Sequence, residues 1–106
     1  MKESDLQHAI RLSVGAQPGR VVLWRNNVGE ATHVSAGRIS VVRYGLAPGS
    51  ADLVGLRADG RFVALELKAP GGRVRPEQAA WLELVRRMGG VGAVVRSVDE
   101  AWEAIG

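Results

Sequence analysis

The chain has 106 residues, 46% of them hydrophobic and 24% charged, which is the composition of a single globular domain, here residues 1–106. It contains no cysteine, which excludes disulfides and thiolate metal sites and fits a reducing cytoplasm. No apolar run approaches the ~20 residues of a membrane span, and no apolar signal segment follows Lys2. We therefore expect a soluble, cytoplasmic protein without membrane contact.

The net charge of +3 is unevenly distributed along the chain. Residues 1–50 hold six Lys and Arg against three Asp and Glu, whereas residues 51–106 hold eight of each. A moderate basic excess suits a polyanionic partner, but many proteins with this charge bind none. Charge alone therefore indicates nucleic acid only weakly.

The first segment, residues 3–14, has the apolar period of an amphipathic helix. Glu3 falls on its inward stripe and is a candidate for a functional site. Alternatively, Ser4 and Gln7 form a capping box, which would leave Glu3 outside the helix as a solvated acid. Both interpretations of Glu3 stay open at this point.

Residues 20–26 predict a strand, with Trp24 in the core. The polar residues that follow Trp24 are suited either to phosphate contacts or to an ordinary turn. From 28 to 49 the periodicity is lost except for a short strand over residues 38–44. We expect this glycine-punctuated segment to be mobile and to face the substrate, with Arg38 and Arg43 near phosphates.

The centre of the sequence is a predicted hairpin, because two apolar runs flank Asp59-Gly60. A two-residue loop would place Asp52 opposite Leu67. A three-residue loop with glycine in the left-handed conformation would place Asp52 opposite Glu66. We favour the three-residue loop.

In that register Asp52, Glu66 and Lys68 share one face of the sheet. Two opposed carboxylates repel each other, so a positive charge must compensate. Lys68 supplies one charge, and gathered carboxylate oxygens are what Mg²⁺ requires. The pattern favours metal-assisted phosphodiester cleavage, in which Lys68 orients the water or offsets developing charge. Solvated strand ends give the same short pattern without any function.

A helix is predicted from Pro76 to about Met88, where two glycines end it. Gln78 in its first turn faces either the charged patch or solvent. The expected buried stripe of this helix consists of Trp81, Leu84, Val85 and Met88.

The last segments are an apolar run, Val91 to Arg96, typical of an inner strand, and a helix that Ser97 and Glu100 begin with a capping box. The order of elements predicts an α/β fold with a mixed central sheet flanked by helices.

An ordered set of residues supports a more specific interpretation. The set consists of Gly49-Ser50-Ala51-Asp52, Ala64-Leu65-Glu66-Leu67-Lys68, Gly72-Arg73, Pro76-x-Gln78, Gly89-Gly90 and Val94-Val95-Arg96-Ser97. It resembles the PD-(D/E)XK nuclease superfamily and, within it, the VRR-NUC family of small stand-alone phage proteins and domains of larger repair nucleases. The resemblance spans about residues 45–100 and, more weakly, the first helix. Ala51 departs from it, because members usually carry proline there.

The resemblance implies a restriction-endonuclease-like core and a metal-dependent DNA endonuclease, placed in the cytoplasm of a bacterial or phage-infected host cell. The implied ligands of Mg²⁺ or Mn²⁺ are Asp52, Glu66 and the backbone carbonyl of Leu67. Lys68 would help to activate the attacking water, with Glu3 and Gln78 in support. Nucleic-acid contacts are expected from Arg38, Arg43 and Arg73.

The family's stand-alone members suggest branched DNA, such as a Holliday junction, as the substrate. Because two strand cuts need two active sites, and a small domain gains stability by association, we expect a homodimer. The alternative is a catalytically inactive nucleic-acid-binding or scaffold module with the same fold, whose DNA binding depends on salt but not on metal. A dimer without any nucleic-acid partner is the third interpretation.

Overall fold

The computed structural model describes residues 2–106 and contains, within that range, three helices and seven strands. In chain order these elements are α1 (Glu3–Ser13), β1 (Ala16–Gln17), β2 (Val21–Arg25), β3 (Gly29–Ser35), β4 (Arg38–Tyr44), β5 (Leu53–Arg57), β6 (Phe62–Leu67), α2 (Pro76–Arg87), β7 (Val91–Val95) and α3 (Val98–Ile105). Within the described range, no helix has the length and apolarity needed to cross a membrane.

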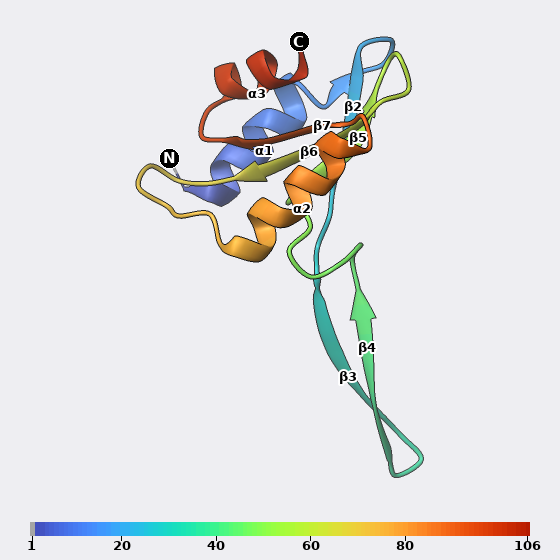
Figure 1. Cartoon of the computed structure of the whole chain (residues 1–106). Coiled ribbons are helices and arrows are strands. Elements are labelled where there is room, and N and C mark those ends of the chain that lie inside the picture. The colour runs from blue at the N-terminus through green and yellow to red at the C-terminus, as the bar shows by residue number, and fades with distance from the viewer. Residues whose placement is uncertain (1) are drawn as a thin grey trace.

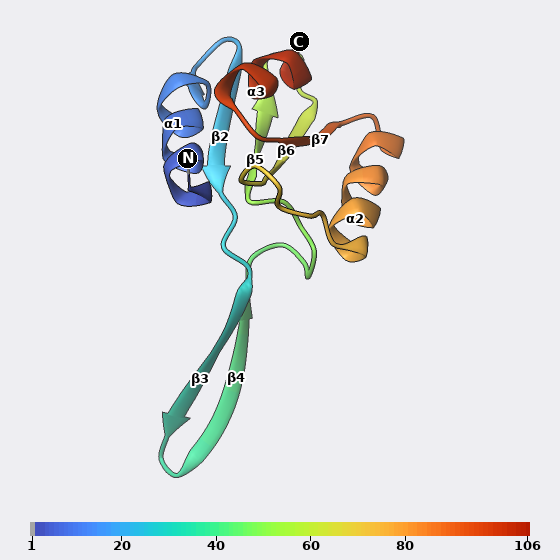
Figure 2. The same ribbon diagram turned by 90° about the vertical axis from the view of Figure 1, so that its left-hand side faces the viewer.

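Five strands form one mixed sheet in the order β1-β2-β5-β6-β7. Neighbouring strands are antiparallel, except that β6 and β7 are parallel. Helices α1 and α3 cover one face, and α2 lies on the other (Figures 1 and 2). This confirms the α/β architecture predicted from the sequence and agrees with a restriction-endonuclease-like core.

The larger part of the core lies between the sheet and the pair α1 and α3. Alternate residues of the central strands, such as Leu53 and Leu65, point to this side and are fully buried. Leu6 and Ile10 of α1 and Ile105 of α3 pack against them. The apolar residues that give residues 3–14 a helical period are therefore buried, whereas Glu3, which was placed on the same inward stripe, is exposed.

The second face of the sheet is only partly covered, because α2 packs on β6 and β7. Trp24 on β2 and Leu56 on β5 lie beyond the helix and are 53% and 49% exposed. The prediction that Trp24 belongs to the core was wrong, since no element covers the part of the sheet on which it stands.

The buried stripe of α2 also differs from the predicted one. Gln78, Leu82 and Val85 face the sheet, whereas Leu84 and Met88 are exposed and Trp81 is half-buried. The helix is turned so that an amide and two aliphatic side chains meet Ala64 and its neighbours. Hydrophobicity alone misassigned the stripe, because the side chain that approaches the polar site is a glutamine.

The β5–β6 hairpin has the predicted three-residue loop. Leu53 pairs with Leu65, and the backbone N–H of Arg57 donates to the carbonyl of Arg61 at 2.9 Å. Gly60 has φ +87°, the left-handed conformation that this loop requires. The same register places Asp52 at the level of Glu66.

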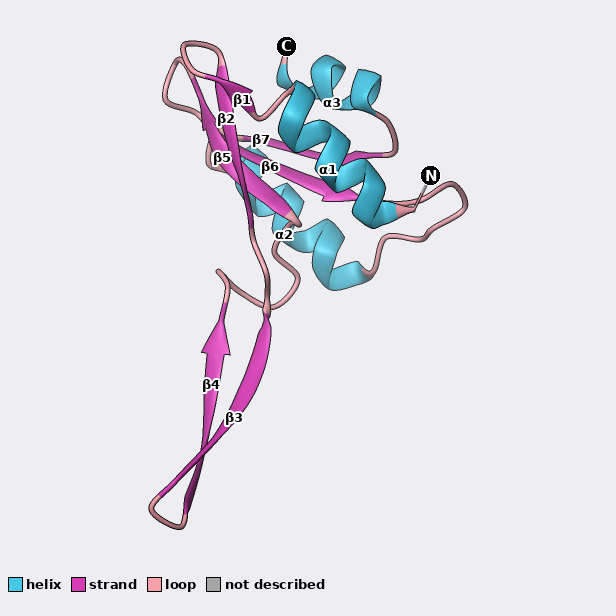
Figure 3. Cartoon of the chain, turned by 180° about the vertical axis from the view of Figure 1, so that it is seen from behind, coloured by secondary structure: helices cyan, strands magenta, loops and turns pink. Residues whose placement is uncertain are grey.

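Residues 29–44 form a separate two-stranded ribbon, here called the arm, which projects from the core (Figures 1 and 3). Strand β4 has its predicted bounds, but the loss of periodicity before it gave no sign of β3, which pairs along its whole length with β4. Positive φ at Ala36 and Gly37 makes the turn at its tip.

Strand β7 is at the edge of the sheet, not inside it as its apolar run predicted. The run is apolar because α2 and α3 pack on its two faces. The predicted cap of α3 is confirmed in part: Oγ of Ser97 accepts from the backbone N–H of Glu100 at 3.0 Å, but the Glu100 carboxylate accepts from the N–H of Arg96 and not from that of Ser97.

Candidate active site

The site begins where β5 and β6 place two acids side by side. Asp52 directly precedes β5, and Glu66 is the penultimate residue of β6. Oδ2 of Asp52 accepts from the backbone N–H of Leu67 at 2.8 Å. Because the N–H and C=O of a strand residue point to the same edge, the carbonyl of Leu67 is directed toward Asp52 as well.

The carboxylate of Glu66 is only 2% exposed, and its two oxygens differ. Oε1 accepts from Nε2 of Gln78 at 3.1 Å and lies 3.7 Å from Nζ of Lys68. Oε2 is buried and has no hydrogen-bond partner among the residues that the structure describes. An unsatisfied buried carboxylate oxygen is costly, so the site lacks a positive or donating group at this position.

Burial raises the pKa of Glu66 to about 8, and the neighbouring Asp52 carboxylate acts in the same direction, because it repels the ionised form of Glu66 and can accept a hydrogen bond from the protonated form. The ammonium of Lys68 opposes this increase, and the charge of Glu3 adds to it. The positive charge of Lys68 alone thus does not offset the burial and the negative charges that disfavour an ionised Glu66. A divalent cation would supply the missing charge.

The donor set fits a hard divalent ion. Two carboxylates and a backbone carbonyl offer oxygen ligands, which Mg²⁺ binds while it keeps several waters. Residues 2–106 contain no ready-made cluster of three or more His, Cys, Asp or Glu side chains. The ligands that the protein would provide are therefore Asp52, Glu66 and the carbonyl of Leu67. A cation bound there would give Oε2 of Glu66 the partner that it lacks.

Gln78 lies where the first turn of α2 meets the sheet. Of the two alternatives predicted for it, it faces the charged patch and not solvent. Its Oε1 accepts from the backbone N–H of Arg75 at 2.9 Å, while its Nε2 donates to Glu66. The two bonds fix the orientation of the amide. The side chain is buried and links the start of the helix to the acidic pair.

Lys68 follows β6 directly, and its backbone N–H donates to the carbonyl of Val95 at 3.2 Å. Its side chain is largely buried, with its ammonium beside Glu66. A lysine held in this way presents one positive charge to the site with little freedom to leave it.

Glu3 is the first residue of α1, and Lys2 occupies the N-cap position without a side-chain hydrogen bond. The Ser4 and Gln7 capping box was therefore wrong, because the N-cap is Lys2 and the helix begins two residues too early for Ser4 to cap it. Glu3 is exposed and influences Glu66 through its charge. Its position is that of a peripheral acid and not of an observed partner of Asp52.

Asn26 connects the end of β2 to the segment that carries Asp52, a role that no sequence pattern indicated. Its Nδ2 donates to Oγ of Ser50 at 2.8 Å and to the carbonyl of Ala51 at 2.9 Å. Its Oδ1 accepts from the N–H of Leu46, and its own N–H donates to the carbonyl of Asp52 at 2.8 Å. Asn26 thus fixes the backbone on both sides of the arm.

A polar cleft of about 560 Å³ opens beside the acids. Asp52 and Gln78 line it together with Arg25, Arg75 and Tyr44. Tyr44 is at the root of the arm, so the arm begins at the edge of the cleft. Two guanidinium groups and an aromatic ring suit a phosphate backbone and a base.

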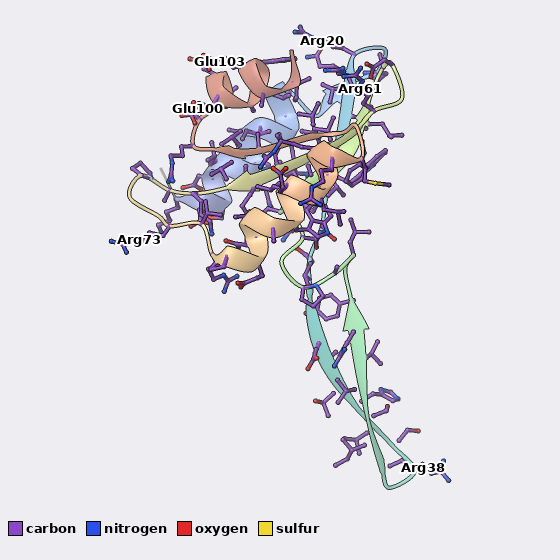
Figure 4. The ribbon with its side chains drawn as sticks, in the orientation of Figure 1. Arg20, Arg38, Arg61, Arg73, Glu100 and Glu103 are labelled. Atoms are coloured by element: carbon purple, nitrogen blue, oxygen red, sulfur yellow. The ribbon has the colours of Figure 1, made fainter. Side chains whose placement is uncertain are left out.

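The three predicted nucleic-acid residues do not come together. Arg38 is at the tip of the arm, and Arg73 lies in the loop before α2, far from it (Figure 4). Arg43 forms an ion pair with Glu30 at 3.1 Å, and both side chains are exposed. Arg25 and Arg75 lie nearer to Asp52, but nothing in their spacing distinguishes them from surface arginines.

Comparison with protein families agrees with this geometry. The model of the VRR-NUC domain matches residues 1–99 of the 106-residue chain. No curated protein and no solved structure was found to match. The match includes Asp52, Glu66 and Lys68, together with α2 and β7. The chain belongs to the VRR-NUC family, and so carries a nuclease-type domain.

Proposed function

We propose that residues 1–106 act as one domain, a Mg²⁺- or Mn²⁺-dependent DNA endonuclease that cuts branched DNA, such as a Holliday junction, as a cytoplasmic homodimer. The observation that carries the proposal is the buried, unpartnered Oε2 of Glu66 beside Asp52. It gives a physical reason for an ion at the place where the family's nuclease chemistry would occur.

When bound, the ion would polarise a phosphoryl oxygen and lower the pKa of a water, which could then lose a proton to solvent and attack as hydroxide. Asp52, Glu66 and the carbonyl of Leu67 would hold it. Gln78 keeps Glu66 in place through its 3.1 Å hydrogen bond, so that Oε2 stays directed to the site. Holding a carboxylate rigidly avoids reorganisation during the reaction.

Lys68 is the residue best placed to act on the water. Its ammonium lies 3.7 Å from Oε1 of Glu66 and is shielded from solvent. From there it would hold the attacking water or offset negative charge on the phosphate in the transition state. Both roles need the positive charge, so a neutral side chain of similar length would not replace it.

The cleft supports a nucleic-acid backbone as the ligand. Arg25 and Arg75 border it, and Tyr44 provides a ring at its edge. Phosphate contacts of this kind position a backbone without reading sequence. The preference for branched DNA rests on analogy with the family, and the homodimer supplies the second active site that a double-strand cut requires.

The test is cleavage of labelled duplex, single-stranded, flap and four-way-junction DNA with Mg²⁺, Mn²⁺ or EDTA. We expect metal-dependent cutting by the wild type that Asp52→Asn and Lys68→Met reduce at least about a hundredfold. Glu103→Gln is the matched control, because this exposed carboxylate lies on α3, away from the cleft (Figure 4).

If the wild type binds these DNAs but cuts none with either metal, the inactive binding module replaces the nuclease. Equal cutting by Asp52→Asn and the wild type would move the chemistry to other residues. A four-way junction cut no faster than duplex would remove the branched substrate while leaving the nuclease in place.

A further inference from the structure

The arm has an apolar face that no other part of the described chain, residues 2–106, covers. The pairing of β3 with β4 places Val34 beside Ile39 and Thr32 beside Val41, and these four residues are here called the apolar arm face. Val34, Ile39 and Val41 are 66%, 74% and 59% exposed. An isolated two-stranded hairpin is at best marginally stable in water, so a ribbon with this face needs a partner.

A second apolar surface is the part of the sheet that α2 leaves bare. The β2–β5 and β5–β6 registers place Val22, Trp24, Val54, Leu56 and Phe62 on this side of the sheet, and they are here called the open sheet face. Val54 and Phe62 lie at its border with α2, where the Phe62 ring meets Trp81 edge-on. Trp24 and Leu56 are about half exposed, and Phe62 is exposed as well. None of these five side chains carries a charge.

The two surfaces do not meet within one chain. The arm extends away from the core in every view, and the long dimension of the molecule is 51 Å (Figures 1, 2 and 3). Each surface is therefore left in water although a complementary one exists on the same chain. A second copy can supply to each the surface that it lacks.

Charge argues for protein and against DNA as the partner of the apolar arm face. Beyond its three aliphatic side chains and Thr32, the face continues only to Glu30 and Arg43, which pair with each other at 3.1 Å. The exposed cation at the tip, Arg38, projects from the opposite face of the ribbon, because it pairs with Ser35. A phosphate backbone would meet aliphatic side chains here.

We propose that two copies of this chain exchange arms, so that the apolar arm face of each copy lies on the open sheet face of the other. Such an exchange closes around a twofold axis and buries both contacts at once. A seven-residue strand spans about 23 Å, enough to cross three strands spaced about 5 Å apart. Each copy would bury Val34, Ile39, Val41, Trp24, Leu56 and Phe62.

The area is adequate for association. At these exposures each of the six side chains offers on the order of 100 Å². Together with their polar surroundings they approach the ~800 Å² per partner of a standard interface. The inference specifies the surface of the homodimer included in the proposed function, but its test needs neither DNA nor metal, so the two can fail separately.

The first experiment is sedimentation equilibrium of the full chain, whose mass is 11.3 kDa. We expect the wild type to be a dimer at micromolar concentration and Val34→Asp/Ile39→Asp to dissociate at least about a hundredfold more readily, because two carboxylates would then be buried. His33→Asp/Ser40→Asp adds the same charge to the opposite face of the same ribbon and should stay dimeric.

Circular dichroism and urea unfolding of both double variants check that the core is intact, which we expect because the arm lies outside it. A wild type that is monomeric at 100 µM, on the order of the weakest useful dimer, overturns the proposal. So does a Val34→Asp/Ile39→Asp variant that dimerises as well as the control.

A second experiment tests the arrangement itself and uses the absence of native cysteine. An Ile39→Cys chain is mixed with a Leu56→Cys chain, and a short bismaleimide is added. We expect the mixed product to exceed either self-linked product. Predominant self-linking of the Ile39→Cys chain would indicate that arms pair with arms. A Val34→Asp/Ile39→Asp variant that stays dimeric while losing DNA affinity would assign the face to DNA. Either outcome refutes the exchange.

Discussion

Nε2 of Gln78 donates to Oε1 of Glu66 at 3.1 Å, while Oε1 of the same amide accepts from the backbone N–H of Arg75 at 2.9 Å. One side chain therefore caps the start of α2 and satisfies half of the buried carboxylate. The amide links the packing of the helix to the electrostatics of the site.

Replacing this amide should affect both the free energy of unfolding and the pKa of Glu66. We expect Gln78→Leu to lower the free energy of unfolding by about 1–3 kcal/mol, because a buried carboxylate oxygen and a helix N–H lose their partners. Urea unfolding measures this change. Gln17→Leu is the control, since that amide is exposed and contacts only the carbonyl of Ser13. Equal losses of unfolding free energy in the two variants would mean that the hydrogen bonds of Gln78 stabilise the fold no more than those of an exposed amide.

The raised pKa of Glu66 has a consequence for stability against pH. Burial and Asp52 raise this pKa from 4.5 to about 8, so the folded chain holds the proton more tightly than the unfolded chain. The resulting stabilisation is complete below pH 4.5 and is lost as the pH rises toward 8. We expect metal-free protein to lose up to a few kcal/mol of unfolding free energy over this interval.

The check is urea unfolding from pH 5 to pH 8 in EDTA, wild type beside Glu66→Gln. Because the amide cannot ionise, the variant should show a much flatter pH dependence. If both proteins lose stability with the same slope, the titrating group is not Glu66.

A divalent ion should reverse that loss. Metal binds the ionised carboxylates and displaces the proton, so Mg²⁺ or Mn²⁺ should raise the melting temperature more at pH 8 than at pH 5.5. Asp52→Asn should abolish most of the increase, and Glu103→Gln should retain it. Thermal unfolding with and without metal measures both effects, and an increase that survives in Asp52→Asn would place the ion elsewhere.

Asn26 should matter for both the fold and the site. Asn26→Ala removes its hydrogen bonds to Ser50, Ala51 and Leu46, and we expect a loss of about 1–3 kcal/mol in the free energy of unfolding. Because Asp52 follows Ala51 directly, metal-induced stabilisation should weaken as well. Asn27→Ala, which loses only a bond from Arg25, should leave both nearly unchanged. The reverse order of effects would contradict the assigned role.

Gly55 is required by the close approach of two strands. A Cβ built on it would overlap the carbonyl oxygen of Val22 on β2, which is backbone and cannot turn away. Gly55→Ala should therefore cost at least about 2–3 kcal/mol. Gly72→Ala, where the nearest atom is the carbonyl oxygen of Ala69 at 3.1 Å in a loop, should cost less. Comparable melting temperatures for the two variants would show that the strands adjust.

The pairing of Asp52 with Glu66 was predictable because local signals determine it. Asp59-Gly60 sets the loop, side-chain alternation sets the face, and the register follows by counting. Gln78 was predictable only as one of two alternatives, since the rotation of α2 decides which side it faces. The roles of these residues in catalysis stay predictions.

The predictions that were wrong concern residues whose burial depends on which surfaces other elements cover. Trp24 is exposed because α2 stops short of β2, and β7 is apolar at a sheet edge because helices cover both its faces. No local pattern contains that information. The hydrogen bond between Asn26 and Ser50 could not be predicted from the sequence for another reason, because the whole arm lies between the two residues in the chain.

Asn26 also closes the chain at the root of the arm, since its N–H and side chain meet the carbonyl of Asp52 and Ser50. Everything between these residues leaves the sheet and returns to the same point. Lengthening such a closed excursion costs only about 0.6 kcal/mol for each doubling. The sequence and length of this segment can therefore change at little energetic cost, while the backbone that holds Asp52 beside Glu66 stays the same.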